Sequence, residues 1–248
     1  MNKQKLQSII SKYYLNGLVE STKWVINDNI LNIKFNSPNR DMIGEIQFED
    51  INLPDAEIAV YDTSQLDKLI GITADELDLM LIKSGKNFNK LIINDKSYEL
   101  IYPLADLFLI KNPGKVNVNS EFDIKCGLNS DIMSSIIKAK NAIQNDSISI
   151  ELEEQLGEDK SKIVLIFGDE TSNHTNKIKY KLDVLNINPN ISKEFSLPFN
   201  SEVIKSILNS NKDALKSFMS INTNGLLYFE FHGDGWYSNY YLVRKAEN

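Results

Sequence analysis

The sequence is poor in residues that usually hold metals or carry redox chemistry. Its 248 residues include one cysteine, Cys126, and two histidines, His174 and His232, which lie far apart. One cysteine excludes an internal disulfide bond, and the Cys and His clusters of common metal sites are missing. No stretch approaches the ~18 consecutive apolar residues of a membrane-spanning helix. Residues 1–6 lead into a polar amphipathic run and not a signal-peptide core, so we expect a cytoplasmic protein that does not contact membranes.

The sequence also lacks the familiar catalytic motifs. It contains no Gly-rich phosphate loop, no His-x-x-x-His pair and no serine in a nucleophile elbow. Gly233-Asp234-Gly235 is typical of a hairpin turn. A solvated acidic hairpin explains Glu151, Glu153, Glu154, Glu158 and Asp159 better than a divalent-cation site does, because their spacing matches no known cation loop. We therefore expect no enzymatic activity, no metal and no cofactor.

Arginine is scarce and acidic residues are in excess. The net charge is -7, and only Arg40 and Arg244 among the 27 basic residues are arginines. This balance argues at first against a nucleic-acid partner, because phosphate binding depends on cationic side chains. Lysine, however, holds a phosphate as a point charge without the bidentate geometry that arginine uses to read base edges. If DNA is a partner, binding independent of base sequence is the expected mode.

Helical periodicity predicts four short amphipathic helices, at residues 3–14, about 63–72, about 130–141 and 201–210. Asp62, Asn129 and Asn200 are the expected N-caps of the last three. Each helix carries lysine on its polar side, while the acidic excess falls on strands and turns. One such helix is ordinarily a solvated face. Four of four on a chain of net charge -7 favour a functional role for these lysines.

Alternating patterns between these helices predict strands, and the order of helix, strands, helix, strands occurs twice. We therefore predict an α+β protein with two similar domains and negligible sequence identity between the halves. Pro103, Pro113 and Gly114 interrupt the pattern at mid-chain, although residues 107–110 are too apolar for a solvated linker. The predicted limits are 1–110 for the first domain, 111–120 for a connector that packs on the protein, and 121–248 for the second domain.

Four segments carry a resemblance to a known family. Residues 56–62 (Ala-Glu-Ile-Ala-Val-Tyr-Asp), 98–106 (Tyr-Glu-Leu-Ile-Tyr-Pro-Leu-Ala-Asp) and 177–182 (Lys-Ile-Lys-Tyr-Lys-Leu) resemble the DNA polymerase sliding clamp of T4-like phages. Residues 240–247 are similar to the terminal strand of proliferating cell nuclear antigen, the eukaryotic clamp. The resemblance follows nearly the whole chain in order, through short hydrophobic motifs. The chain departs from the phage pattern in a longer hairpin around residues 151–160 and a longer turn near 209–213.

The resemblance implies a non-catalytic processivity factor of the DNA-clamp fold. Such a factor is a head-to-tail homotrimeric ring, with helices lining a central hole and antiparallel sheets outside, which encircles duplex DNA and tethers the replicative DNA polymerase. Edge strands of neighbouring subunits are expected to close the ring. The interface residues implied here are Glu99, Leu100, Ile101 and Tyr102 of one subunit and Lys177, Lys179, Tyr180 and Lys181 of the next. Two ordinary edge strands guarded by charge are the alternative.

The resemblance also implies two kinds of contact. Lysines facing the hole are expected to touch DNA phosphates without reading sequence: Lys3, Lys5, Lys12, Lys68, Lys138, Lys140, Lys205 and Lys212. A short peptide of a partner protein is expected to dock in a hydrophobic pocket beneath the connector. The pocket residues implied are Met42, Leu107, Phe108, Ile110, Tyr241 and Leu242, for which core filling is the alternative.

The expected partners are the DNA polymerase, a clamp-loader ATPase and, for the phage branch, late-transcription factors in the host cell cytoplasm. A β-rich phage structural or adhesion protein remains the alternative, since repeated β-rich units with Asn-rich turns also build such components. That alternative does not explain lysine on the polar side of every helix.

Overall fold

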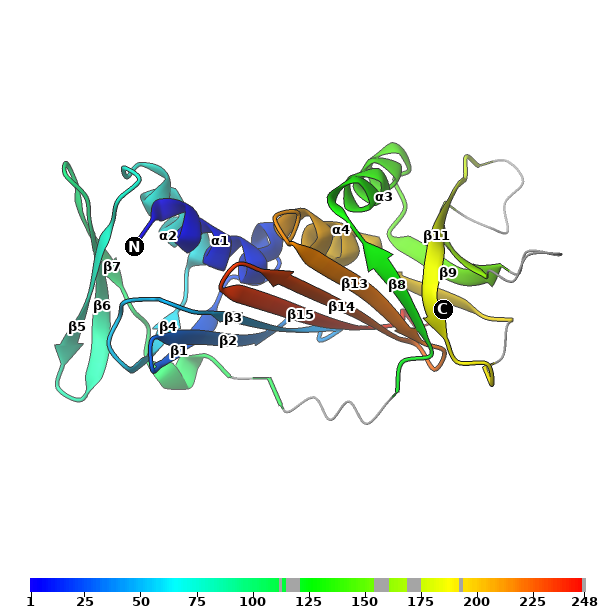
Figure 1. Ribbon diagram of the computed structural model, residues 1–248. Coiled ribbons are helices and arrows are strands. Elements are labelled where there is room, and N and C mark those ends of the chain that lie inside the picture. Colours follow the sequence, from blue (N-terminus) through cyan, green and yellow to red (C-terminus); the bar gives the residue numbers. More distant parts are fainter. Residues whose placement is uncertain (112, 115–120, 154–160, 169–174, 192–193, 247–248) are drawn as a thin grey trace. The chain divides into compact units, whose positions relative to one another are not determined.

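The computed structural model describes residues 1–111, 113–114, 121–153, 161–168, 175–191 and 194–246 (Figure 1). The chain divides into two compact units. The first comprises Met1–Lys115 and Gly235–Ser238, and the second comprises Val116–Asp234 and Asn239–Asn248. Most of the predicted connector, 111–120, and residues 154–160 of the predicted acidic hairpin lie outside the described residues.

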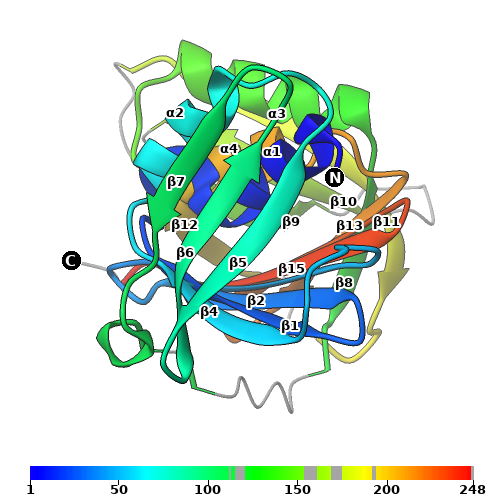
Figure 2. The ribbon, with the colours of Figure 1, turned by 90° about the vertical axis from the view of Figure 1, so that its left-hand side faces the viewer.

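The first unit contains two helices, two sheets and two short 3-10 turns. Its elements in chain order are α1 (Lys3–Tyr14), η1 (Leu15–Gly17), β1 (Thr22–Asn27), β2 (Ile30–Asn36), β3 (Met42–Phe48), β4 (Ala56–Val60), α2 (Thr63–Gly71), β5 (Asp78–Ser84), β6 (Asn87–Asn94), β7 (Glu99–Pro103) and η2 (Leu107–Leu109). Neighbouring strands run in the order β4-β1-β2-β3 in one sheet and β5-β6-β7 in the other, and the pairs are antiparallel. Figure 2 shows β5, β6 and β7 side by side.

The second unit repeats this plan. Its elements are β8 (Ile124–Leu128), α3 (Ser130–Ala142), β9 (Ser147–Glu153), β10 (Lys162–Phe167), β11 (Ile178–Ile187), β12 (Ser196–Asn200), α4 (Ser201–Ser210), β13 (Lys216–Asn222), β14 (Leu226–Gly233) and β15 (Trp236–Val243), of which Trp236 to Ser238 group with the first unit. The order β12-β9-β10-β11 matches β4-β1-β2-β3, and β13-β14-β15 matches β5-β6-β7. The prediction of two similar α+β domains is confirmed, and the repeat is one of topology.

Each helix begins at a side chain that accepts hydrogen bonds from its first turn. Asp62 accepts from Gln65 N at 2.8 Å, Asn129 from Ile132 N at 2.8 Å, and Asn200 from Glu202 N at 3.1 Å. These three caps are confirmed; Asn2, which accepts from Gln4 N at 2.7 Å, caps the first helix. Each cap is worth about 1 kcal/mol of helix stability. The caps determine where the helices start, and hence which residues face the sheet.

Both helices of a unit pack on one face of its sheet (Figures 1 and 2). In the first unit, Leu6, Ile9, Ile10 and Tyr13 of α1 are buried at helical spacing. In the second, β10 is buried at every residue from 163 to 167, so both of its faces are covered. Burial of such apolar side chains is the main favourable term of the fold.

Strand β12 runs through Pro198 directly into α4. Pro198 fits because β12 is the edge strand of its sheet, where a missing N–H donor is tolerated.

Gly44 makes room for an aromatic ring in the first core. Gly44 lies opposite Phe35 in the β2–β3 pair, and a Cβ atom at Gly44 would overlap the Phe35 ring. Phe35 in turn packs edge-on against Tyr13 of α1, with ring centroids 6.3 Å apart. The glycine is therefore required by close approach of a side chain that also contacts the helix.

We predict that Gly44→Ala lowers the free energy of unfolding by about 2 kcal/mol, because an overpacked core must shift the Phe35 ring. Thermal unfolding followed by circular dichroism measures the change. Gly71→Ala is the matched control, since nothing lies within 4 Å of a Cβ atom at Gly71. Equal melting temperatures for the two variants would show that Phe35 relocates without cost.

Candidate functional site

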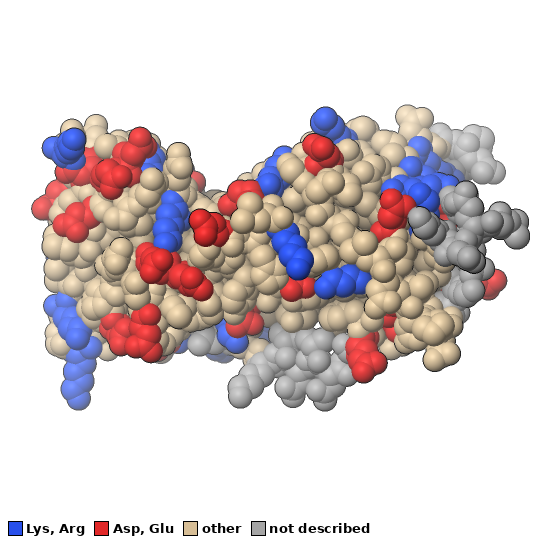
Figure 3. All heavy atoms as spheres, viewed as in Figure 1, with Lys and Arg blue, Asp and Glu red and all other residues tan. Residues whose placement is uncertain are grey.

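Exposed lysines stand on α2, on α3 and after α4. Lys68 of α2, Lys138 of α3 and Lys212 are exposed, and none of them forms an ion pair with another described residue. In the space-filling view, cationic and acidic side chains are interspersed over the visible face (Figure 3). In the described part of the chain, an anion that approaches one of these three ammonium groups has no salt bridge to break.

Lys3 and Lys5 of α1 are held by backbone carbonyls. The Lys3 ammonium donates to Gly71 O at 2.9 Å and to Thr73 O at 2.6 Å, at the C-terminal end of α2. The Lys5 ammonium donates to Glu49 O at 2.6 Å and to Asp50 O at 3.0 Å. A lysine near a helix C-terminus stabilises the unsatisfied carbonyls and the helix dipole. Both lysines therefore serve as braces within the first unit.

Lys12 is buried, so the expectation that it lies on the exposed side of its helix is wrong. Its residue is 1% exposed, and its ammonium lies 3.8 Å from the centre of the Trp236 ring and 3.0 Å from Ser8 Oγ. Trp236 is itself stacked on Phe48, with centroids 6.0 Å apart. A desolvated cation over a tryptophan face is a favourable contact. The helical pattern could not predict this contact, because Trp236 lies near the other end of the chain.

Lys140 and Lys205 share one carboxylate. Lys140, in the last turn of α3, is 6% exposed and lies 2.9 Å from one oxygen of Glu202. Lys205 of α4 lies 3.4 Å from the other oxygen of Glu202. The hydrogen bond from Lys140 and the charges of both lysines lower the pKa of Glu202. Lys140 is therefore on the buried side of α3, against the expected exposed position, and neither lysine is unpaired.

The residues expected to form a peptide pocket divide between core and surface. Met42 and Leu242 are buried in the core, as is Ile110, so core filling holds for them. Leu107 and Tyr241 are half-buried, with Tyr241 stacked on Tyr228 at 4.6 Å, and Phe108 is 78% exposed. Strand alternation explains the error at Met42: residues of β3 alternate between core and surface, and Met42 is on the core side.

A cavity does lie beside the start of the connector, lined by different residues. This connector cavity measures about 330 Å³. Its lining residues are Asn36, Arg40, Ile43, Lys111, Pro113 and Gly114. Ile43, the neighbour of Met42, supplies the apolar wall, and Arg40 has the left-handed φ of 59°. The sequence pattern indicated Met42, whereas the residue that lines this cavity is its neighbour Ile43, on the other side of the strand.

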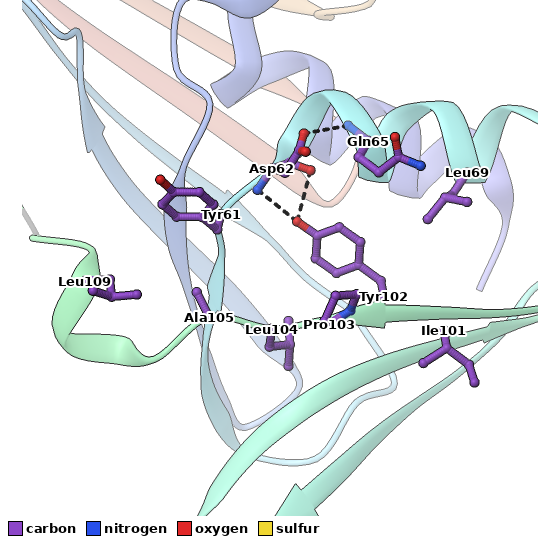
Figure 4. Close-up of a pocket in the computed structure, with 10 residues that line it drawn as sticks. All are labelled: Tyr61, Asp62, Gln65, Leu69, Ile101, Tyr102, Pro103, Leu104, Ala105 and Leu109. Carbon is purple, nitrogen blue, oxygen red and sulfur yellow. Dashed lines mark hydrogen bonds between the residues drawn. The ribbon is translucent and has the colours of Figure 1, made fainter.

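A second cavity, of about 520 Å³, lies beside β7 and α2 (Figure 4). Tyr102 contributes its hydroxyl, which accepts from Asp62 N at 3.0 Å and donates to Asp62 O at 2.9 Å. Burial raises the pKa of Tyr102. The remaining wall is mostly apolar, with Leu69, Ile101, Leu104 and Leu109 (Figure 4). Tyr61 also lines it and is exposed, as are Ile101 and Leu109, so this β7 cavity belongs to an exposed apolar patch of the kind found at protein interfaces.

The predicted interface strands have free edges in the described part of the chain. β7 is the edge strand beyond β6, with Glu99 and Ile101 exposed and Tyr102 buried. β11 pairs with β10 from residue 178 to 183, whereas its pairing with β8 begins only at Val184. Lys177, Lys179 and Lys181 are exposed, and Lys181 contacts Glu153 at 2.6 Å. One edge thus carries an acidic residue beside apolar ones, and the other carries lysines.

Among the described residues, no group of His, Cys, Asp and Glu is arranged to hold a metal ion. His174 and the distal part of the acidic hairpin lie outside them. Cys126 is buried, and burial raises the pKa of its thiol to about 12, so the reactive thiolate is suppressed. No helix in the described part of the chain is long and apolar enough to span a membrane.

No family model and no curated protein sequence matches this chain. Solved structures match its fold along nearly its whole length. Proliferating cell nuclear antigen (PCNA) from Entamoeba histolytica has a TM-score of 0.74 at 14% identity, covering 99% of this chain and 96% of its own. PCNA from Thermococcus kodakaraensis has a TM-score of 0.73 at 15% identity, covering 99% and 98%. A. fulgidus PCNA, solved with the C-terminal region of FEN-1, has a TM-score of 0.77 at 14% identity, covering 100% and 98%.

The chain therefore has the fold of PCNA-type sliding clamps, and the expected fold class is confirmed. These matches are to cellular clamps, and the narrower likeness to clamps of T4-like phages stays a prediction.

Because its ammonium is buried over Trp236, we predict that Lys12→Ala lowers the free energy of unfolding by about 2 kcal/mol. The control, Lys138→Ala, removes an exposed charge and is expected to change stability by less than about 0.5 kcal/mol. Thermal or urea unfolding measures both. If the two variants unfold alike, the Lys12 contact contributes nothing to stability.

Proposed function

We propose that this protein is a sliding clamp, a non-catalytic homotrimeric ring that encircles duplex DNA and tethers a DNA polymerase for processive synthesis. The observation that carries the proposal is the repeated unit. Two helices lie on one face of an antiparallel sheet, twice in the chain, in a fold shared with PCNA over nearly its full length. In this proposal the helices face DNA, the sheets face outward, and residues 111–120 connect the two domains.

The charges suit a ring that slides. Lys68, Lys138 and Lys212 offer phosphate contacts, while Lys3 and Lys5 add charge near the start of α1. Contacts from lysine to phosphate carry no sequence information, and each is weak at physiological salt. A ring held by topology requires only such contacts. The excess of acidic residues elsewhere would disfavour DNA on other faces.

Ring closure would use the free edges of β7 and β11. Glu99 on β7 has the opposite charge to the exposed Lys177 and Lys179 at the start of β11, which fits a head-to-tail contact between subunits. The apolar patch around the β7 cavity, with Ile101 and Leu109, would be covered in the same contact. A heterologous contact of this kind closes into a ring when its rotation is correct.

Partner proteins would dock through short peptides at the connector cavity. Ile43 gives this cavity an apolar wall, and Arg40 and Lys111 add positive charge at its rim. The A. fulgidus clamp, solved with the C-terminal region of FEN-1, is a neighbour known to hold a partner peptide. For this chain the proposed partners are the DNA polymerase, a clamp-loader ATPase and, if the protein belongs to a phage, late-transcription factors in the host cytoplasm.

We expect Ile101→Glu to convert the trimer to monomers, because it places a charge in the apolar part of the proposed contact. Analytical ultracentrifugation over a range of concentrations measures the assembly. Met80→Glu is the matched control: Met80 is 40% exposed on β5, at the other edge of the same sheet, and Ile101 is 52% exposed. A monomer for the wild-type protein at every concentration would contradict the ring and favour a phage structural protein. Equal dissociation of both variants would contradict the β7 interface.

Topological binding is tested by trapping rings on DNA. Rings that thread onto linear duplex over its ends are expected to stay on it in high salt once ligation has closed the circle, and to leave when the circle is recut. Lys68→Ala combined with Lys138→Ala is expected to lower the salt dependence of duplex binding, by about 0.9 in log–log slope for each phosphate that is no longer neutralised. Lys34→Ala, on the sheet, is the control. Release of all protein from closed circles in high salt would contradict encirclement.

A further inference from the structure

A polar cavity lies between α3 and α4 in the second unit. This α3–α4 cavity measures about 500 Å³. Its lining residues are Lys140, Asn141, Gln144, Asp146, Glu202 and Lys205. It differs from the connector and β7 cavities in being lined almost wholly by charged and amide side chains. Two lysines and two carboxylates balance, so the cavity as it stands is electrically neutral.

The Glu202 carboxylate stands between the two lysines in the manner of a bound anion. One of its oxygens is 2.9 Å from the Lys140 ammonium and the other is 3.4 Å from the Lys205 ammonium. The Lys140 side chain is only 7% exposed, so its ammonium is held in place by the packing of its stem. A phosphate group presents oxygens to lysine in the same way. The site is thus preorganised for an oxyanion and filled by the protein's own carboxylate.

Glu202 is free to leave in a way that Lys140 is not. Its side chain is 58% exposed, and it is in the first turn of α4, where its backbone N–H is fixed by Asn200. Rotation of its side chain would move the carboxylate into solvent without disturbing the helix. Asp146 carries the second carboxylate, and its backbone is held by its carbonyl, which accepts from Ser201 N at 3.1 Å. Among the described residues, no ion pair between its carboxylate and either lysine competes with an incoming anion.

We propose that the α3–α4 cavity is a binding site for a backbone phosphate of duplex DNA, and that Glu202 keeps this site occupied until a phosphate displaces its carboxylate. The inference rests on the proposed function for the source of the phosphate, and the site itself rests on the cavity. Glu202 then lowers the affinity of this helix pair for DNA. Such a latch would let a clamp slide with little drag.

The central variant is Glu202→Gln, which keeps the shape and hydrogen-bonding capacity of the side chain and removes its charge. Fluorescence anisotropy across salt concentrations measures the binding of a short labelled duplex. We expect the variant to bind about threefold to tenfold more tightly, and its log–log salt slope to steepen by about 0.9. Glu230→Gln is the matched control. Glu230 also pairs with a lysine, Lys125 at 3.6 Å, but it lies on strand β14, where neighbours 229 and 231 are the buried side.

A double variant separates a latch from a structural brace. If Glu202→Gln acts by freeing Lys140, then adding Lys140→Met is expected to return duplex affinity to the wild-type value or below. Thermal unfolding of every variant shows whether the helix pair remains folded. Tighter binding in Glu202→Gln that persists after Lys140→Met would overturn the assignment of Lys140 to the site. Unchanged duplex binding in Glu202→Gln with a lowered melting temperature would show a brace and overturn the latch.

A second probe tests the anion site independently of the proposed ring. Inorganic pyrophosphate, titrated by NMR, is expected to shift the amide signals of residues 140–144 and 201–205 more strongly in Glu202→Gln than in the wild-type protein. If pyrophosphate shifts them but no variant binds duplex, the anion site stands and the proposed DNA clamp fails. If duplex binds well and neither probe distinguishes Glu202→Gln from wild type, the clamp stands and the latch fails.

Discussion

The burial of two short amphipathic helices on one face of an antiparallel sheet is the constraint on which the rest of this structure depends. Neither the helices nor the sheet of a unit can bury an apolar face alone, and each helix is too short to be stable in isolation. Once the apolar sides of α1 and α2, or of α3 and α4, meet the sheet, their polar sides must face away from it. The exposure of Lys68 and Lys138 follows from this packing, and the second unit repeats the same packing of helices on a sheet.

The four helices of this acidic chain carry lysines in their described residues, at positions 3, 5, 12, 68, 138, 140 and 205. The structure adds that these lysines are not equivalent. Lys68 and Lys138 are exposed, Lys3 and Lys5 brace backbone carbonyls, Lys12 is buried over Trp236, and Lys140 and Lys205 share Glu202. The number of lysines on the helices therefore exceeds the number ready to meet a phosphate. In the proposed ring, few free lysines would be an advantage, since tight electrostatic binding would oppose sliding.

The candidate contact surfaces depend on strand geometry in a similar way. The β7 cavity forms because Tyr102 turns inward to bond with Asp62 while its neighbour Ile101 turns outward. The same alternation places Met42 in the core and Ile43 at the connector cavity. One residue of register separates a core side chain from a contact side chain. Subunit and peptide contacts are thus proposed on opposite kinds of feature: a free strand edge with exposed apolar residues, and a small cavity with a charged rim.

Local patterns in the sequence determined the four helices, three of their caps and the order of elements that repeats. These features depend on hydrophobic period and on Asx side chains within a few residues of one another, which a single chain displays directly. Only the tertiary structure decided which lysines remain exposed, because the partners of Lys12 and Lys140 are brought from distant segments. The tertiary structure also decided that Met42 lies in the core and Ile43 at the connector cavity, and it brought together the residues of the α3–α4 cavity. Those outcomes depend on which side chains meet after folding, and the sequence carries no local signal of such meetings.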